Sequence, residues 1–403
     1  MTEVGAVTDA VRHFLGTAGD DHFQRKVHVM NLAFLRPLFE RPGSWVSVYL
    51  DATRSEQNAD REVDLRLRAM RERLVAKGAD PAAIDAVEDT IRQRPFEHGR
   101  YGVAVFAQGA DVALVETLSE PPVSENAFVE PLPHAMPLIA ARGEEVPYVR
   151  VLADRTGADL DALTVGGAPR SEKVKGEETY PIHKAKVGGW SQSRFQRAVD
   201  ETWRRNAGDV AAAAAELAEH VGAEVIVVGG DVHAVQDLVA KLPKRWHDRV
   251  VRTEAGSRGA GADETALDDA TARAVADTAR RHVRDVLDRF RAQQGDGTAS
   301  TGLTDVVTRL QRGQADTVLL VNDESSTDKL WIAPDDPTLI SVDDQPLREA
   351  GVQDPLRVRA DAALVRAIAG TGAQLILIEP GELTLEHGIG AVLRYADASS
   401  AAR

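Results

Sequence analysis

A run of consecutive apolar residues in the second half of the chain constrains the fold more than any other feature. Residues 224–228 read EVIVV, which is typical of a strand buried on both faces of a sheet. A strand predicted over 147–153 and a long helical pattern precede this run, and a predicted helix over 232–242 follows it. The apolar residues that share one face of the helical pattern are Phe195, Val199 and Trp203. This alternation of strands and helices predicts an α/β fold.

The segment before this unit, residues 1–145, is predicted to be a mixed helix and strand domain. Residues 44–50 have the β-branched and aromatic composition of a strand, and residues 101–107 and 111–118 form a predicted hairpin. Between them, Val63, Leu67, Met70 and Leu74 form the stripe of an amphipathic helix, and a second helix is predicted over 81–92. The Pro-rich residues 120–137 are expected to form a loop or a sheet edge, because proline cannot donate to a strand ladder.

The segment after the Gly-rich residues 255–262 is predicted to be a third domain. It opens with a predicted helix over 264–293 and continues with a second helix to Arg312. The later elements are a strand over 317–321, a helix over 362–369 and strands over 374–378 and 391–395. We therefore predict that residues 263–403 form an α/β/α sandwich. The predicted domains of the chain are 1–145, 146–256 and 263–403.

Composition excludes several classes of function. The net charge is −15, so any RNA contact must come from a local patch, and we expect no DNA partner. The absence of cysteine excludes disulfides, cysteine-ligated zinc and iron–sulfur clusters, and the 11 histidines show no metal-ligand spacing. We expect no metal and no cofactor. Because no apolar run is long enough to span a membrane, we expect a cytoplasmic protein without a membrane partner.

Two local patterns suggest chemistry but favour a structural interpretation. Gly229 and Gly230 follow a strand, but the full spacing of a dinucleotide-binding loop is missing, so they are predicted to turn the chain into the next helix. Asp154 ends a strand and resembles the first carboxylate of a two-metal nuclease. No partner carboxylates are evident, so a surface or capping role is expected for Asp154.

The most informative stretch is Tyr180 to Arg197, which reads YPIHKAKVGGWSQSRFQR. From Ile182 onward it carries four cationic side chains and no acid. We expect Gly188 and Gly189 at a loop tip, where the missing Cβ atoms allow close approach to another surface, and Ser191 as the N-cap of the following helix. The candidate RNA-binding residues are His183, Lys184, Lys186, Gly188, Gly189, Trp190, Ser191, Gln192, Arg194 and Arg197. A solvated loop before an amphipathic helix remains the alternative.

At these residues the chain resembles the class-1 peptide release factors of archaea and eukaryotes, whose middle domain carries Gly-Gly-Gln followed by Ser-Ala-x-Arg-Phe. Gly188, Gly189, Ser191, Arg194 and Phe195 match that motif. The close of the chain, residues 388–395, also looks like the end of the family's C-terminal domain, and residues 180–184 look like its bacterial branch. The resemblance extends to the actinobacterial, Balon-type ribosome hibernation factors.

This resemblance implies three domains, with an RNase H-like middle domain directed toward the peptidyl transferase centre and an N-terminal domain directed toward the decoding centre. It also implies elongation factor Tu as a possible partner of the C-terminal domain. Trp190 stands where the family has its catalytic glutamine, and an indole offers a donor but no acceptor. The family's stop-codon motifs, one of which includes a cysteine, have no counterpart in residues 1–145.

These departures favour a ribosome hibernation factor over a termination factor. We expect the chain to bind the A site of idle bacterial ribosomes, with Trp190 stacked on ribosomal RNA in the peptidyl transferase centre and no catalysis. One alternative is a peptidyl-tRNA hydrolase of ribosome rescue, with Gln192 as its catalytic residue. Another is an RNA-binding stress protein that never meets the ribosome.

Overall fold

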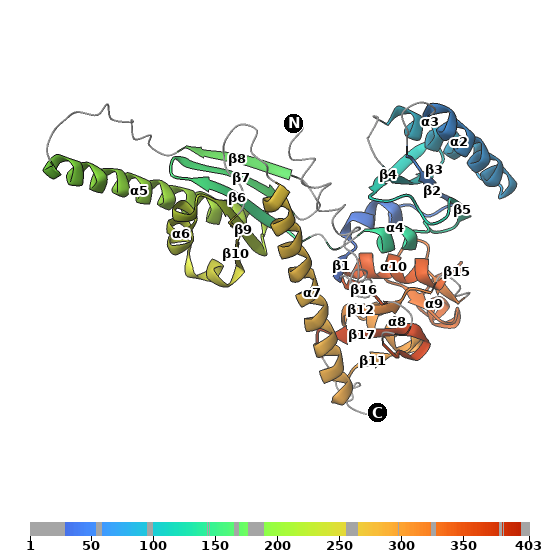
Figure 1. The fold of residues 1–403 in the computed structure, drawn as a ribbon. Helices are drawn as coiled ribbons and strands as arrows, with labels where there is room; N and C mark the ends of the chain where they lie inside the picture. Colours follow the sequence, from blue (N-terminus) through green and yellow to red (C-terminus); the bar gives the residue numbers. More distant parts are fainter. Residues whose placement is uncertain are drawn as a thin grey trace. The chain divides into compact units, whose positions relative to one another are not determined.

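The structure is a computed structural model that describes residues 29–53, 59–94, 100–142, 144, 146–164, 169–175, 189–254, 265–296, 298–323, 328–378, 381 and 383–395. For residues 59–61, 169 and 189–200 it describes the backbone and not the side chains. The chain divides into two compact units (Figure 1). We call residues 145–281 the central unit, and residues 26–144 together with 282–403 the terminal unit.

The central unit is built on a five-stranded sheet in the order β10-β9-β6-β7-β8. Its strands are β6 (Tyr148–Asp154), β7 (Gly157–Leu163), β8 (Pro169–Lys175), β9 (Val225–Gly230) and β10 (Val250–Arg252). The apolar strand β9 lies between β6 and β10 and runs parallel to both, whereas β6, β7 and β8 are antiparallel. The predicted burial of this strand on both faces is confirmed, because Val225 to Val228 are all at most 1% exposed.

Residues 168–189 are polar and rich in lysine, and their sequence predicts a loop, which strand β8 corrects in part. Residues 169–175 instead form an edge strand beside β7. The side chain of Ser171 donates a hydrogen bond to Asp161 on β7 (Oγ to Oδ1, 2.8 Å), and Lys173 pairs with Asp159 (Nζ to Oδ1, 3.8 Å). Polar cross-strand pairs and charged side chains suit a strand at a sheet edge, where apolar periodicity is not required.

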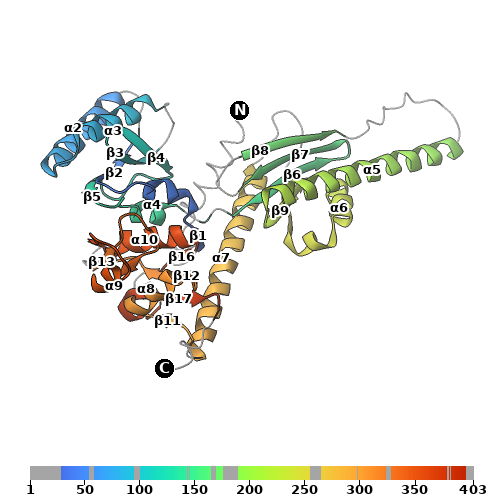
Figure 2. The same cartoon turned by 180° about the vertical axis from the view of Figure 1, so that it is seen from behind.

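Helices cover both faces of this sheet (Figures 1 and 2). On one face, α5 (Gly189–Val221) and α6 (Val232–Lys241) pack against alternate residues such as Val151 and Val228. On the other face, the first half of α7 (Thr265–Gly295) packs against Leu152 and Val227. The two-residue period of the strands thus divides each strand between two apolar layers. A short 3₁₀ helix, η2 (Lys244–Arg249), leads into β10.

Helix α7 contributes to the cores of both units. Leu267 and Ala274 belong to the central core, whereas Val286 and Phe290 belong to a core of the terminal unit. The division between the units falls between Arg281 and His282. The division into two compact units does not test the predicted domain boundaries. The domains 1–145, 146–256 and 263–403 therefore stay predictions.

The terminal unit contains three further sheets. One has the order β4-β3-β2-β5, from β2 (Trp45–Asp51), β3 (Gly102–Gln108), β4 (Asp111–Leu118) and β5 (Asn126–Glu130). The second has the order β1-β16-β12-β17-β11, from β1 (Val29–Asn31), β11 (Ser300–Thr301), β12 (Ala315–Val321), β16 (Gln374–Ile378) and β17 (Ile389–Leu393). The third has the order β14-β13-β15, from β13 (Lys329–Ile332), β14 (Ile340–Ser341) and β15 (Leu356–Arg359).

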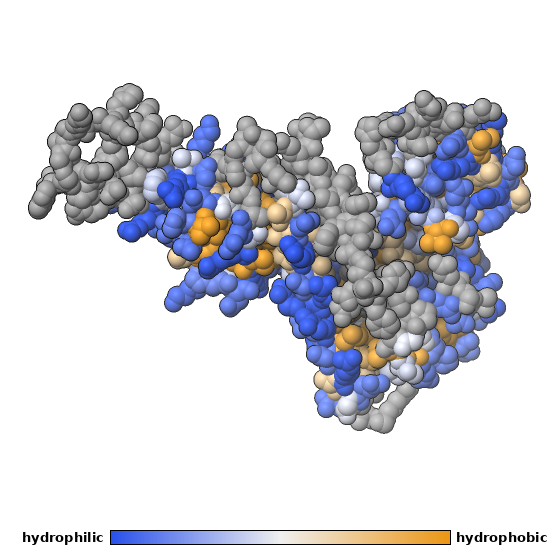
Figure 3. Space-filling view, in the orientation of Figure 1, coloured by the Kyte–Doolittle hydropathy of each residue, from blue (hydrophilic) through white to orange (hydrophobic). Residues whose placement is uncertain are grey.

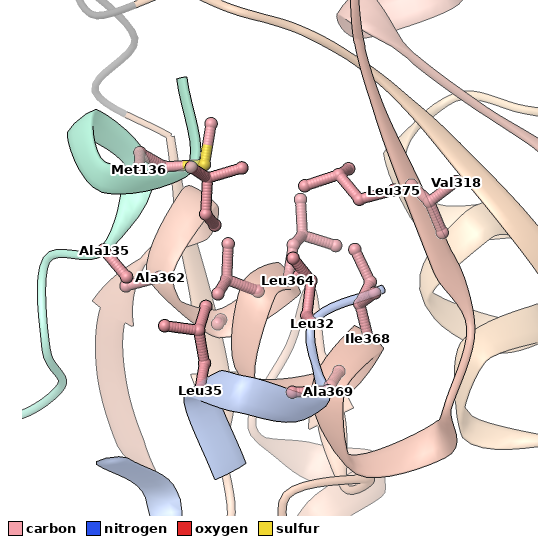
Figure 4. Packing of buried hydrophobic residues seen from close by; sticks show 14 of the residues in the cluster. Leu32, Leu35, Ala135, Met136, Val318, Ala362, Leu364, Ile368, Ala369 and Leu375 are labelled. Carbon is pink, nitrogen blue, oxygen red and sulfur yellow. The ribbon is translucent and has the colours of Figure 1, made fainter. Parts of the chain in front are cut away.

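Helices of the terminal unit complete its cores. They are η1 (Ala33–Phe39), α2 (Ala59–Ala76), α3 (Pro81–Gln93), α4 (Met136–Ala141), α8 (Leu303–Gln311), α9 (Gln345–Glu349), α10 (Ala360–Thr371) and η3 (Glu386–Gly388). Figure 4 shows Leu35 of η1 and Met136 of α4 packed with Leu364 and Ile368 of α10. Helix η1 and helix α10, which are far apart in the sequence, therefore share one hydrophobic core.

Most of the predicted elements are confirmed. The stripe Val63, Leu67, Met70 and Leu74 is buried on α2, and the predicted hairpin is β3 and β4. Within the Pro-rich segment, β5 lies at the edge of its sheet. The predicted α/β class is also confirmed by these sheets and their covering helices.

Candidate functional site

The start of α5 is the candidate site that the structure describes in part. Four of the predicted binding residues, His183, Lys184, Lys186 and Gly188, lie outside the described residues. The other six lie in the first turns of α5, where the backbone is described. They are Gly189, Trp190, Ser191, Gln192, Arg194 and Arg197.

The observed start of α5 corrects two sequence interpretations. The helix includes Gly189, which was expected at a loop tip. Ser191 lies two residues inside the helix, so it is not the N-cap residue. In the first turn of a helix, backbone N–H groups still have no intrahelical partner, so this end of α5 keeps a partial positive charge.

Helical geometry decides which side of α5 each candidate residue occupies. An α-helix turns by about 100° per residue. Buried Val210, Leu217 and Val221 mark the side of α5 that faces the sheet. Counted back along the helix, Trp190 falls on the opposite side, and Arg194 and Arg197 fall within about 60° of it. Trp190 and the two arginines therefore fall on one side of α5.

The described part of α5 continues this cationic side. Arg204 and Arg205 are both exposed and also fall within about 60° of Trp190 around the helix axis. Exposed Glu201 lies between them and offsets one charge. Gln192, in contrast, falls about 200° from Trp190, on the side that packs toward the sheet further along. Gln192 and Trp190 therefore fall on opposite sides of the helix axis.

Contacts from the turn between β6 and β7 fix the middle of α5. The guanidinium carbon of Arg155 lies 4.3 Å from the centroid of the Trp203 ring, a cation–π contact. The side-chain amide of Asn206, which is 2% exposed, donates a hydrogen bond to the carbonyl oxygen of Arg155 (3.0 Å). These contacts anchor the helix at the point where it meets the sheet.

Arg155 also links this turn to the start of α6. Its Nε lies 3.5 Å from Oδ1 of Asp231, which caps α6 by accepting hydrogen bonds from the amides of His233 and Ala234 (3.0 Å each). Partial burial raises the pKa of Asp231, but the Ala234 amide and the Arg155 charge outweigh burial and hold that pKa below its usual value. Asp231 is therefore a charged structural cap.

The two weaker sequence candidates have structural roles. Asp154 accepts hydrogen bonds from the amide and hydroxyl of Thr156 (2.7 Å each) in the β6–β7 turn. Gly230 ends β9 with φ 119°, and a Cβ atom there would lie 1.9 Å from the carbonyl oxygen of Ala153. The prediction that Gly229 and Gly230 carry the chain from strand to helix is confirmed, since α6 begins two residues later.

Sequence reasoning missed a second cationic segment in the central unit. Residues 241–252 read KLPKRWHDRVVR, with five lysines and arginines and one aspartate. The segment covers the end of α6, η2 and β10. Its charge density, against a chain of net charge −15, was the signal available in the sequence.

The structure holds no sign of a metal centre or a membrane span in the parts that it describes. Among the described residues, no group of three or more His, Asp or Glu side chains is arranged to hold a metal ion. No described helix combines the length and the apolar character needed to cross a bilayer.

Comparisons with solved structures give distant matches. An archaeal translation termination factor is 16% identical, with 90% of this chain and 97% of that chain covered and a TM-score of 0.25. The Pelota protein of Archaeoglobus fulgidus is 14% identical, with 90% and 91% covered and a TM-score of 0.31. Dom34 of S. cerevisiae, described as a translation termination-like factor, is 12% identical, with 75% and 81% covered and a TM-score of 0.33.

Sequence comparisons identify the family. The family model described as bacterial archaeo-eukaryotic release factor family 2 matches residues 147–296, which run from β6 to the end of α7. An uncharacterized protein of Mycobacterium tuberculosis, found in two strains, is 31% identical over 365 residues, covering 90% of this chain and 96% of the relative. The chain therefore belongs to the bacterial branch of the archaeal and eukaryotic release factor family.

Proposed function

We propose that this chain is a ribosome-binding translation factor that occupies the A site of idle ribosomes and blocks the peptidyl transferase centre without catalysis. Membership of the release factor family supports the ribosome as its partner, because peptide release takes place there. The observation that carries the proposal is Trp190, which stands at the position of the family's catalytic glutamine, within the segment that the family model matches.

An indole at this position suits binding better than hydrolysis. Trp190 has one N–H donor and no acceptor, so it cannot hold a water molecule as a carboxamide does. Its ring can stack on a nucleotide base, an interaction worth about 1–3 kcal/mol. The arginines on the same side of α5 can contact phosphate groups next to that base. In this proposal the end of α5 binds ribosomal RNA and leaves the peptidyl ester intact.

The position of Gln192 favours this proposal over a peptidyl-tRNA hydrolase. A hydrolase would need a carboxamide at the place where Trp190 stands. Because Gln192 lies about 200° around the helix from Trp190, it replaces Trp190 only if the first turn of α5 unwinds. Such unwinding would also move Arg194 away from Trp190. A partnership with elongation factor Tu stays a prediction that rests on the resemblance alone.

Co-sedimentation with vacant bacterial ribosomes tests the proposal. At low salt the purified chain should pellet with these ribosomes. It should also reduce the puromycin reaction of ribosomes that carry peptidyl-tRNA in the P site, because puromycin needs a free A site. Arg194→Ala with Arg197→Ala should weaken binding and should lower the slope of log affinity against log salt by about 1.5, because two phosphate contacts are lost.

A matched control variant distinguishes the loss of the candidate site from a general loss of positive charge. Arg291→Ala with Arg348→Ala removes two exposed arginines from the terminal unit, where each pairs with a neighbouring carboxylate. This control variant should bind ribosomes as the unmodified chain does. If the chain fails to pellet, or pellets without lowering puromycin reactivity, A-site blocking is wrong.

A further inference from the structure

The central unit has a pocket that the proposed function does not use. It has a volume of about 280 Å³ and lies between the η2–β10 segment and α7. Buried Val225 and Ala274 are part of its lining, and both belong to the apolar layer between the sheet and α7. The pocket therefore lies on the face of the sheet opposite to the one that α5 covers.

Arginines dominate the rim of this pocket. Two come from the η2–β10 segment and two from α7, and all four are exposed. They are Arg249, Arg252, Arg273 and Arg281. Thr253 and Thr278 also line the pocket. In Figure 3 the exposed side of α7 is hydrophilic.

None of these four arginines has a carboxylate partner among the described residues. Arg273 donates a hydrogen bond to the carbonyl oxygen of Asp269 (Nε to O, 3.2 Å), and Arg281 donates one to the hydroxyl of Thr278 (Nη2 to Oγ1, 2.9 Å). Arg249 lies near the Trp246 ring, 5.9 Å from its centroid. Of the two lining carboxylates, Asp248 and Asp277, the latter pairs with Arg280 outside the pocket.

Three other arginines of the same unit have carboxylate partners. Arg150 contacts Asp161 and Asp268, Arg155 contacts Asp231, and Arg245 contacts Glu219. Four unpaired guanidinium groups around one small pocket repel one another, and an anion bound between them would remove that repulsion. Guanidinium groups also match the geometry of phosphate oxygens with paired N–H donors.

The dimensions of the pocket favour a ligand that carries several phosphates along a strand, as a nucleic acid does. Its volume lies just below the usual range for small-molecule sites, so it has room for a phosphate and sugar and little more. Arg273 and Arg281 are eight residues apart on α7, about 12 Å along the helix. Cations at this separation can hold two phosphates of one strand that are not adjacent, whereas a single phosphate would engage only part of the rim.

We propose that this pocket binds the phosphate backbone of RNA, as a second RNA contact of the central unit on the face away from α5. The proposal rests on the proposed function in one respect, that the RNA in the cell is ribosomal. The binding chemistry itself requires only the pocket. The site needs no base recognition, so affinity should depend strongly on salt and weakly on sequence.

Fluorescence anisotropy with a labelled polyuridylate of about 12 nucleotides tests the proposal on the full chain. Arg252→Ala with Arg273→Ala should weaken binding at low salt at least about tenfold and should lower the salt slope by about 1.4, since each phosphate contact on a single strand contributes about 0.7. The control, Arg245→Ala with Arg284→Ala, also removes one arginine from residues 241–252 and one from α7, outside the pocket. It should keep at least half of the affinity.

Equal losses in the two double variants, or no loss in either, would overturn the pocket as an RNA site. A melting-temperature shift with inorganic phosphate that depends on Arg252 and Arg273, without any effect on polyuridylate, would assign the pocket to a small anion and would also overturn it. Ribosome co-sedimentation tests the proposed function independently of this inference. If the chain binds polyuridylate through the pocket but does not pellet with ribosomes, the proposed function fails and this inference stands.

Discussion

The guanidinium group of Arg155 lies over the indole ring of Trp203, with 4.3 Å between the guanidinium carbon and the ring centroid. Arg155 belongs to the turn after β6, and Trp203 lies four turns into α5, so this contact ties the helix that carries the candidate site to the sheet. A double-mutant cycle of Arg155→Ala and Trp203→Ala should give a coupling energy of about 0.5–1 kcal/mol in urea unfolding. A cycle of Arg155→Ala with Trp246→Ala, far along the chain in η2, should give a coupling near zero. Equal couplings would contradict the contact.

The buried guanidinium of Arg150 is expected to be the most important charge in the central unit. It is 6% exposed, its Nη2 lies 2.6 Å from Oδ2 of Asp161, and its Nη1 contacts Asp268 on α7. Burial raises the pKa of Asp268, and the Arg150 charge opposes that rise. Arg150→Met should therefore lower the free energy of unfolding by about 3–5 kcal/mol, because two carboxylates lose their partner. Arg170→Met, at an exposed position on β8, should change it by less than about 0.5 kcal/mol.

Gly230 is predicted to tolerate no side chain. A Cβ atom there would lie 1.9 Å from the carbonyl oxygen of Ala153, in addition to the cost of its φ of 119°. Gly222, at the end of α5, has a φ of 67° and no atom within 4 Å of the added Cβ. Gly222→Ala should therefore cost about 1–2 kcal/mol, from conformation alone, and Gly230→Ala should cost clearly more. Urea unfolding of the two variants measures the difference, and similar losses would show that β6 can move away from Gly230.

Much of the fold follows from apolar periodicity. The strand over 224–228 and the stripe on α2 were predicted because their buried side chains repeat with the period of the element. The missed elements lack that signal. β8 is a charged edge strand, and β13, β14 and β15 are short strands within residues 329–359, where turns interrupt any pattern. Their pairing is decided by distant neighbours, which local sequence does not encode.

The candidate site was predicted from composition and resemblance. Only part of its geometry could be predicted from the sequence. The sequence indicated a helix that carries Phe195 and Trp203 on one face, and α5 confirms that helix. It placed the helix start three residues too late, because Ser191 is a strong capping residue type and the preceding glycines are poor helix formers. The arginine pocket was missed because its two halves, in η2–β10 and α7, are separated in sequence by a Gly-rich segment.

Acid should destabilise the terminal unit through His134. Its ring packs on Phe128, with centroids 4.0 Å apart, and its Nδ1 is buried without a hydrogen-bond partner among the described residues. Burial lowers the pKa of His134, the charge of Asp361 opposes this shift, and those of Arg359 and Lys77 add to it. The unfolded chain therefore takes up a proton below about pH 6.5 that the folded chain resists, so the free energy of unfolding falls as the pH falls through that value.

Urea midpoints at about pH 7.5 and about pH 5.5 check this dependence. The unmodified chain should lose up to about 1.4 kcal/mol more between these values than His134→Gln, which cannot titrate. Comparing the two proteins cancels the contribution of other titrating groups, such as Glu130, whose pKa is raised by burial. An identical pH dependence in both would mean that His134 is protonated as easily in the folded chain as in the unfolded one.

The proposed function predicts that replacing Trp190 converts a blocking protein into a releasing one. Trp190→Gln places a carboxamide, with a donor and an acceptor, at the position where the release factor family carries its glutamine. Release of labelled peptide from ribosomes with peptidyl-tRNA should be undetectable with the unmodified chain and should rise at least about tenfold with Trp190→Gln, which corresponds to about 1.4 kcal/mol of transition-state stabilisation. Gln192→Ala should leave release unchanged, because position 192 lies on the other side of α5. Peptide release by the unmodified chain that is lost in Gln192→Ala would instead identify a peptidyl-tRNA hydrolase.

The Trp190→Gln variant can also contradict the proposal. If it binds ribosomes but releases nothing, position 190 does not reach the peptidyl ester, and the assignment of Trp190 to the peptidyl transferase centre is wrong.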